Sequence, residues 1–184
     1  MDTVMLNRSE VHNLLDMDEL YSKLRSGFKN YSQRSNNVGL RVRSPLKHEN
    51  TSAMVLFPGL VDDIPAFTIK NHAKFPYESP AIKGVIHLHH IETGELLAIM
   101  DSTYITSIRT GMAGEMGTHL LAQKDADKVA VVGAGVQGKL QLKSLSYLRD
   151  FSEVYIYDKR EENTVNMVDD MQDDIPETFH ICSL

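Results

Sequence analysis

A glycine-rich loop between an apolar run and a helical pattern constrains this chain more than any other feature. Residues 129–138 read VAVVGAGVQG, with glycines at the spacing Gly-x-Gly-x-x-Gly. The apolar run predicts a strand over 128–132, and a helix is expected from about Val136. Glycines at such a junction permit a tight turn, close approach of a ligand and close helix packing. Because helix-start amides favour phosphate, we expect a dinucleotide pyrophosphate to bind at Gly133, Ala134, Gly135, Val136, Gln137 and Gly138.

A carboxylate stands where the second strand of such a unit ends. The segment EVYIYD predicts a strand over 153–157, and Asp158 follows it, 20 residues after Gly138. A carboxylate there binds the adenosine ribose hydroxyls and repels a 2′-phosphate, so Asp158 favours NAD over NADP. Lys159 and Arg160 weaken this preference because a cation there could receive a phosphate. A glycine turn that binds nothing is the alternative interpretation. A helix is expected near 161–171, and a further strand from Phe179.

Composition excludes several classes of protein. The 184 residues are 42% hydrophobic and carry a net charge of −6, which is typical of a soluble globular protein. No basic run is present, which argues against a nucleic-acid partner. The N-terminus lacks a signal-peptide pattern, and no apolar stretch approaches the roughly 20 residues that span a bilayer. The single cysteine, Cys182, fits a reducing compartment, so we expect a cytoplasmic protein without membrane segments.

The segment before residue 125 has a different pattern. Ser9 is expected to cap a short helix through Leu15, and Asp16 with Glu19 predicts a second helix to about Tyr31. Apolar residues at helical spacing predict one buried face on that second helix, formed by Met17, Leu20, Tyr21, Leu24 and Phe28. Strands are expected near 40–45, 52–57, 65–71, 84–91 and 96–100, with a hairpin turn at IETGEL.

A helix that begins at Ser102 or Thr103 connects the two patterns. It contains a run of small residues, which lower helix propensity and indicate close approach by another backbone or a ligand: Gly111, Ala113, Gly114 and Gly117.

The stretch from Ile82 to Gly138 resembles the ornithine cyclodeaminase/mu-crystallin family. In that family a glycine-led strand, a T-G-x-x-x-A hairpin and an acidic-threonine-arginine helix start lead directly into the glycine loop. The matching positions here are Gly84, Thr93, Gly94, Ala98, Asp101, Thr103, Thr106, Arg109 and Thr110. The opening Glu10–Met17, an arginine strand near residue 42 and Lys70 also fit. The resemblance covers the whole chain but only about the front half of a family member.

The resemblance implies an α/β protein with two domains. We expect an N-terminal α+β domain for substrate binding and dimerisation over 1–124. The first part of a Rossmann-type, doubly wound NAD-binding domain is expected over 125–184. The implied activity is NAD(H)-dependent hydride transfer at the Cα of an amino acid or cyclic imino acid, as in ornithine cyclodeaminases and the related alanine dehydrogenases. The implied assembly is a homodimer.

The resemblance also assigns substrate and cofactor residues. Lys70 and Arg109 are implied to bind the substrate carboxylate, and cations of this kind are its natural receptors. An arginine on the preceding strand is implied too. Arg41 and Arg43 would share a strand face, so both stay open, and we favour Arg43. Thr110 is expected to contact the cofactor. Exposed charges without a function are the alternative interpretation for each cation.

Several positions depart from the family pattern. Ala81 stands where some cyclodeaminases carry a carboxylate-binding threonine, which weakens ornithine as the substrate. His90 replaces the aspartate often found before the hairpin and completes the sequence HLHH. His87 and His89 would share a strand face, but no carboxylate or cysteine pattern completes a metal site, and we expect none.

The family's catalytic aspartate would lie beyond residue 184. Later strands of a doubly wound sheet would also lie there, so the sequence predicts a truncated product or fragment that is not competent on its own. The alternative function is a non-catalytic, mu-crystallin-like protein that binds a dinucleotide or other ligand.

Overall fold

The computed structural model describes residues 2–33, 41–46, 53–61, 64–175 and 178–183. The chain divides into two compact units, residues 1–106 and 107–184. The boundary falls inside helix α3 (Thr103–Leu121), so most of that helix belongs to the second unit. The domain division expected at residue 125 follows the change of sequence pattern, and it stays a prediction. Within the described residues, no helix is both long and apolar enough to cross a membrane.

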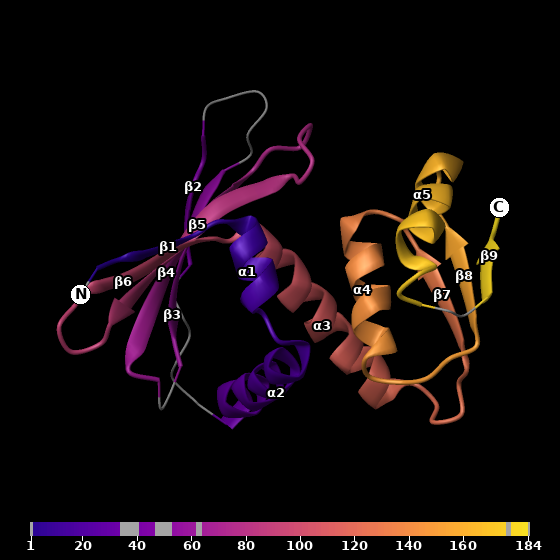
Figure 1. The fold of residues 1–184 in the computed structure, drawn as a ribbon, viewed down its shortest axis with the longest axis horizontal. Coiled ribbons are helices and arrows are strands. Elements are labelled where there is room, and N and C mark those ends of the chain that lie inside the picture. Colours follow the sequence, from indigo (N-terminus) through magenta and orange to yellow (C-terminus); the bar gives the residue numbers. More distant parts are fainter. Residues whose placement is uncertain (1, 34–40, 47–52, 62–63, 176–177, 184) are drawn as a thin grey trace. The chain divides into compact units, whose positions relative to one another are not determined.

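The first unit is built on a six-stranded sheet with the order β1-β6-β5-β4-β3-β2 (Figure 1). Strands β2 to β6 pair antiparallel, and β1 joins the edge of β6 in parallel. Five of the strands were expected, and the structure confirms them with ends shifted by a few residues. The strands are β1 (Val4–Leu6), β2 (Val42–Ser44), β3 (Met54–Leu60), β4 (Ala66–Lys74), β5 (Ile82–His90) and β6 (Leu96–Asp101).

Two helices precede most of this sheet. Helix α1 (Arg8–Leu14) is capped by Asn7 and not by Ser9, so that expectation was wrong. The Asn7 side chain accepts hydrogen bonds from the backbone N–H of Ser9 at 2.9 Å and of Glu10 at 3.1 Å. The Glu10 carboxylate accepts in return from the Asn7 N–H at 2.7 Å. A capping box needs its acid three residues after the cap, and Glu10 has that spacing from Asn7.

Helix α2 (Met17–Gln33) begins as expected, because Asp16 Oδ1 accepts a hydrogen bond from the Glu19 N–H at 2.8 Å. Its predicted buried face is wrong in degree. No residue of α2 is buried, the first four positions of the face are half-buried, and Phe28 is 53% exposed. Helical spacing identified the inward side of the helix, but packing against the described part of the chain covers that side only partly.

The hairpin between β5 and β6 turns where the sequence predicted it, with Gly94 at a φ of 71°. His90 organises this turn: its Nδ1 accepts hydrogen bonds from the backbone N–H groups of Glu92 and Thr93, both at 3.3 Å. An aspartate at this position would accept the same bonds. The imidazole therefore replaces the hydrogen-bonding role of the aspartate that the family often carries.

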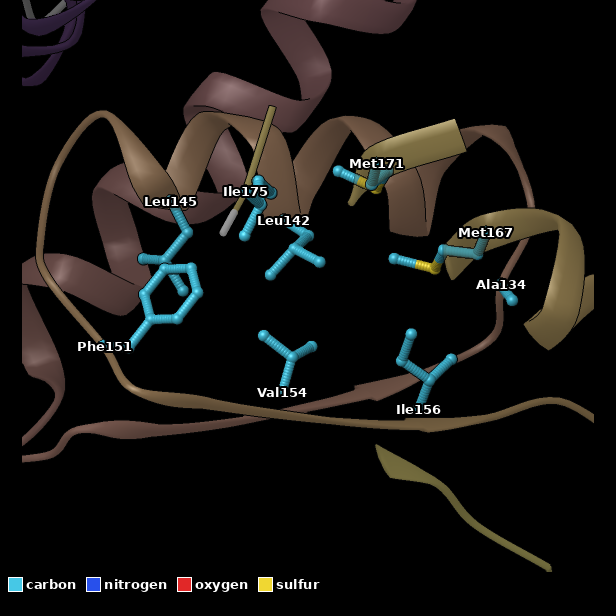
Figure 2. Close-up of a cluster of buried hydrophobic side chains, with 9 residues drawn as sticks. All are labelled: Ala134, Leu142, Leu145, Phe151, Val154, Ile156, Met167, Met171 and Ile175. Atoms are coloured by element: carbon cyan, nitrogen blue, oxygen red, sulfur yellow. The ribbon is translucent and has the colours of Figure 1, made fainter. Parts of the chain in front are cut away.

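The second unit contains a three-stranded parallel sheet with the order β7-β8-β9, which confirms the predicted β-α-β pattern. Its strands are β7 (Lys128–Val132), β8 (Glu153–Tyr157) and β9 (Thr178–Ile181). Helix α4 (Val136–Ser146) follows β7, and α5 (Glu161–Met171) follows β8. Figure 2 shows the core between them, where Val154 and Ile156 of β8 face side chains from both helices.

Small residues of α3 allow α4 to approach closely. A Cβ on Gly111 would lie 2.8 Å from the carbonyl oxygen of Leu140, and one on Gly114 would lie 3.3 Å from the Gln141 amide nitrogen. The expected backbone approach is confirmed at Gly111, whereas Gly114 faces a side chain. Gly117 has nothing within 4 Å of an added Cβ, so packing does not explain that glycine.

Candidate dinucleotide site and substrate-binding residues

The glycines of the loop have separate local causes. Gly133 has a φ of 107°, a conformation that favours glycine, and its N–H donates to the Tyr157 carbonyl at 2.7 Å. A Cβ on Gly138 would lie 2.0 Å from the Gly133 carbonyl oxygen, so α4 can start under the turn only without that side chain. Both glycines are therefore required by the fold of the loop itself.

Neither the backbone conformation nor a close contact requires glycine at position 135. Gly135 is the N-cap of α4 with a φ of −81°, and an added Cβ would meet nothing within 4 Å. Having no side chain, it cannot cap the helix, so the first amides of α4 are left for an external acceptor. Absence of a side chain here gives a ligand access to backbone N–H groups. This geometry suits a phosphate.

Asp158 links three segments around the loop. Its Oδ2 accepts from the Ala134 N–H at 2.9 Å, and its Oδ1 accepts from the Arg160 N–H and from Asn163 Nδ2, each at 3.0 Å. The backbone bonds from Arg160 and Ala134, followed by the Asn163 amide, lower the pKa of the Asp158 carboxyl. The carboxylate is thus ionised and fixed at the position expected from its spacing.

Two cavities in the described part of the second unit flank the loop. One, of about 360 Å³, is lined by Asp158, Asn163 and the ends of β7 and β8. The other, of about 410 Å³, is lined by β7, α4, and Glu115 and Thr118 from α3. Glu115 is only 9% exposed, and burial raises the pKa of its carboxyl against the opposing hydrogen bond with Thr118. The sequence analysis did not single out Glu115, although an acidic residue among the small and apolar residues of GMAGEMG is unusual enough to mark the position.

Lys70 lies on β4 within the first unit. Its Nζ donates to Thr106 Oγ1 at 2.5 Å, and this hydroxyl donates in turn to the Ser102 carbonyl at 2.5 Å. Thr106 is buried, as is Ser102. The structure therefore brings together a lysine and a threonine that the family resemblance had placed in separate motifs.

The two candidate arginines occupy different cross-strand rows. Arg43 pairs with Val55, which pairs with His72. Arg41 lies with its guanidinium carbon 5.5 Å from the centre of the Phe57 ring, and Phe57 pairs with Lys70. Paired residues of a sheet point to one face, so Arg41, Phe57 and Lys70 form one row. The assignment of Arg43, or alternatively of Arg41, to the substrate carboxylate stays a prediction.

Arg109 and Thr110 lie on α3 in the second unit. The Arg109 side chain is exposed and Thr110 is half-buried. Arg109 follows Thr106 by three positions, a spacing that places both on one side of a helix. Their assignment to substrate and cofactor remains a prediction.

The side chains of the β5 histidines contact other rings or the hairpin turn. The His87 and His89 rings lie 6.4 Å apart, and His89 stacks on Phe67 at 4.9 Å. Across the described ranges, no three His, Cys, Asp or Glu side chains are grouped closely enough to hold a metal ion.

The second unit has the parallel sheet, bare glycine loop and strand-end carboxylate of a Rossmann-type nucleotide-binding protein, and a mixed six-stranded sheet precedes it. The chain belongs to the ornithine cyclodeaminase/mu-crystallin family, whose model matches residues 1–182.

Its relatives include several oxidoreductases. The chain is 30% identical over 174 residues to an alanine dehydrogenase of Archaeoglobus fulgidus, covering 94% of this chain and 53% of that relative. It is 26% identical to a Delta(1)-pyrroline-2-carboxylate reductase of Bacillus thuringiensis, covering 86% of this chain and 50% of the relative. The chain thus spans about half the length of these relatives.

Solved structures agree with this assignment. An archaeal alanine dehydrogenase dimer with bound NAD superposes with a TM-score of 0.88 at 28% identity, covering 100% of this chain and 57% of that one. A Delta(1)-pyrroline-2-carboxylate reductase of Thermococcus litoralis, solved with NADH and L-proline, gives 0.89 at 25% identity, covering 98% and 57%.

Proposed function

We propose that this chain forms the substrate-binding and nucleotide-binding part of an NAD(H)-dependent oxidoreductase that acts on an amino acid or cyclic imino acid. The observation that carries the proposal is Gly135, whose missing side chain no contact within the fold explains and which opens the α4 amides to a phosphate. The alanine dehydrogenase and pyrroline-2-carboxylate reductase relatives support the reaction class.

The fixed Asp158 carboxylate supports NAD as the cofactor, since it would repel a 2′-phosphate. When bound, NAD(H) supplies the acceptor or donor of a hydride at the substrate Cα. The loop residues 133–138 would hold its pyrophosphate, with Thr110 as a further contact.

Cationic groups would hold the substrate by its carboxylate. Lys70 is oriented by Thr106, and Arg41 extends the same row beyond Phe57. Arg109 is the third candidate. A carboxylate bound by two or three cations has a fixed orientation, because charge-assisted hydrogen bonds are strong and directional.

A homodimer through the first unit is the assembly we favour. One face of the six-stranded sheet, defined by the rows of Met5 and Leu60, carries exposed apolar side chains: Met5 at 74%, Leu60 at 60%, Val42 at 57% and Ile69 at 37%. Exposed apolar side chains gathered on one face of a sheet favour an interface there. The related alanine dehydrogenase structure is a dimer. A cytoplasmic location agrees with the free thiol of Cys182.

The test is a screen of the purified full-length protein that carries this chain, for hydride transfer with alanine, ornithine, lysine, proline and cyclic imino acids, each with NAD(H) and NADP(H). Calorimetry with NAD runs beside it. Turnover of any substrate with NAD(H) confirms the oxidoreductase. NAD binding without turnover of any substrate supports the alternative of a non-catalytic binding protein. Failure to bind NAD contradicts both.

A further inference from the structure

We propose that Asn163 is a second receptor for the adenosine ribose. Asn163 accepts a hydrogen bond from one ribose hydroxyl and Asp158 from the other, and this arrangement sets the preference for NAD over NADP. This inference rests on the proposed NAD site. It assigns a role to a residue that neither the glycine loop motif nor the strand-end carboxylate identifies.

Asp158 has little hydrogen-bonding capacity left for the ribose. An ionised carboxylate offers about four acceptor positions on its two oxygens. Oδ1 already accepts from the Arg160 N–H and from Asn163 Nδ2, and Oδ2 accepts from the Ala134 N–H. One position on Oδ2 is left. The adenosine ribose of NAD presents two hydroxyls, so the second can donate only to a different acceptor.

Asn163 lies beside Asp158. It is half-buried in the first turn of α5 and lines the same cavity of about 360 Å³ as Asp158. The 3.0 Å bond from Nδ2 to Asp158 fixes the amide group, so its oxygen has one preferred direction. An amide oxygen accepts two hydrogen bonds. Asn163 can therefore take the second hydroxyl without disturbing its bond to Asp158.

Most neighbouring side chains of the cavity cannot accept a hydrogen bond from the second hydroxyl. Lys159 and Arg160 also line the cavity, but both can only donate. Tyr157 is the remaining neutral group with a side-chain acceptor there, and it serves as the competing assignment. A 2′-phosphate would gain nothing from the Asn163 oxygen, since two acceptors repel each other. Removing the amide should therefore weaken NAD without weakening NADP.

The experiment measures affinities of the purified protein by calorimetry for four probes: ADP-ribose, its 2′-deoxy and 3′-deoxy analogues, and 2′-phospho-ADP-ribose. The variants are Asn163→Ala, Tyr157→Phe, and the matched control Asn166→Ala, whose side chain is exposed on the same helix. Loss of one hydrogen bond should weaken ADP-ribose about fivefold in Asn163→Ala. Affinity for the 2′-phospho probe should stay unchanged, as should every affinity in Asn166→Ala.

The deoxy probes identify the contact directly. In the unmodified protein each missing hydroxyl should cost about fivefold in affinity. In Asn163→Ala, the 2′-deoxy probe should bind as well as ADP-ribose, because the acceptor of the 2′-hydroxyl has been removed. The inference is overturned if both analogues lose as much in Asn163→Ala as in the unmodified protein. It is also overturned if Tyr157→Phe alone abolishes one penalty, or if ADP-ribose and its 2′-phospho form weaken together. No binding of ADP-ribose or NAD by the unmodified protein would overturn the proposed function itself, and this inference with it.

Discussion

Lys70 Nζ donates a 2.5 Å hydrogen bond to Oγ1 of Thr106, which joins the middle of β4 to the start of α3. The bond orients the Lys70 ammonium group through a hydroxyl, which carries no charge of its own.

Replacing Lys70 tests its role toward the substrate carboxylate. Lys70→Met keeps the length of the side chain and should lower kcat/KM about 100-fold, because a charge-assisted contact is lost. Thr106→Val should lower it about fivefold, since it removes the bond that orients Lys70 and leaves the ammonium group in place. Steady-state hydride transfer provides the measurement, and Lys74→Met at the exposed end of β4 is the control. Equal effects of Lys70→Met and Lys74→Met would leave Lys70 without a substrate role.

Two glycine substitutions separate the fold of the loop from its ligand. Gly138→Ala places a Cβ against the Gly133 carbonyl oxygen and should lower the free energy of unfolding by about 1–3 kcal/mol together with NAD affinity. Gly135→Ala meets nothing in the protein, so stability should hold while NAD affinity falls at least about tenfold. Denaturant titration and calorimetry measure the two effects. Full NAD affinity in Gly135→Ala would contradict the phosphate site.

Glu115 should destabilise the second unit at neutral pH. Burial raises the pKa of its carboxyl above 4.5, so the folded state binds a proton more tightly than the unfolded state. Stability therefore falls as the pH rises from 4.5 through the higher pKa of the folded state. Glu115→Gln should raise the free energy of unfolding at pH 7 and remove this part of the pH dependence. Denaturation at pH 4 and pH 7 checks both effects. A variant less stable than the parent at pH 7 would show that the charged form is favourably bound.

Glu153 should act in the opposite direction. Its carboxylate pairs with Lys128 at 2.6 Å, accepts from the Tyr155 hydroxyl at 2.6 Å and lies 3.0 Å from His180. These contacts, the Lys128 bond foremost, lower its pKa from 4.5 to about 2, so its stabilisation is complete above 4.5 and lost as pH falls toward 2. Glu153→Gln should lower stability at pH 7 and match the parent near pH 2. The exposed Glu162→Gln is the control, and denaturation curves across this range provide the measurement.

Much of the second unit could be predicted because its signals are local. The glycine spacing fixed the loop, and the alternation in EVYIYD fixed β8 and the position of Asp158. Asn163 could not be found in this way, because its importance comes from a hydrogen bond to Asp158 formed only when α5 returns over the strand. Glu115 stands out in the sequence as an acid among small residues, but its burial beside β7 follows only from the fold.

The first unit was harder to predict for physical reasons. Strand β1 has three residues, too few to show a period, and it is stabilised by pairing with β6, more than 90 residues away. Arg41 and Arg43 have the same parity, so sequence could not separate them. Cross-strand register distinguishes their neighbours, since it depends on the pairing of β3 with β4.

The hairpin at His90 bears on how relatives of this chain are recognised. Its ring nitrogen receives the two turn amides that an aspartate would receive, so the position selects for an acceptor and not for a negative charge. A search pattern that demands an acid there would discard this chain for a difference that leaves the backbone path intact.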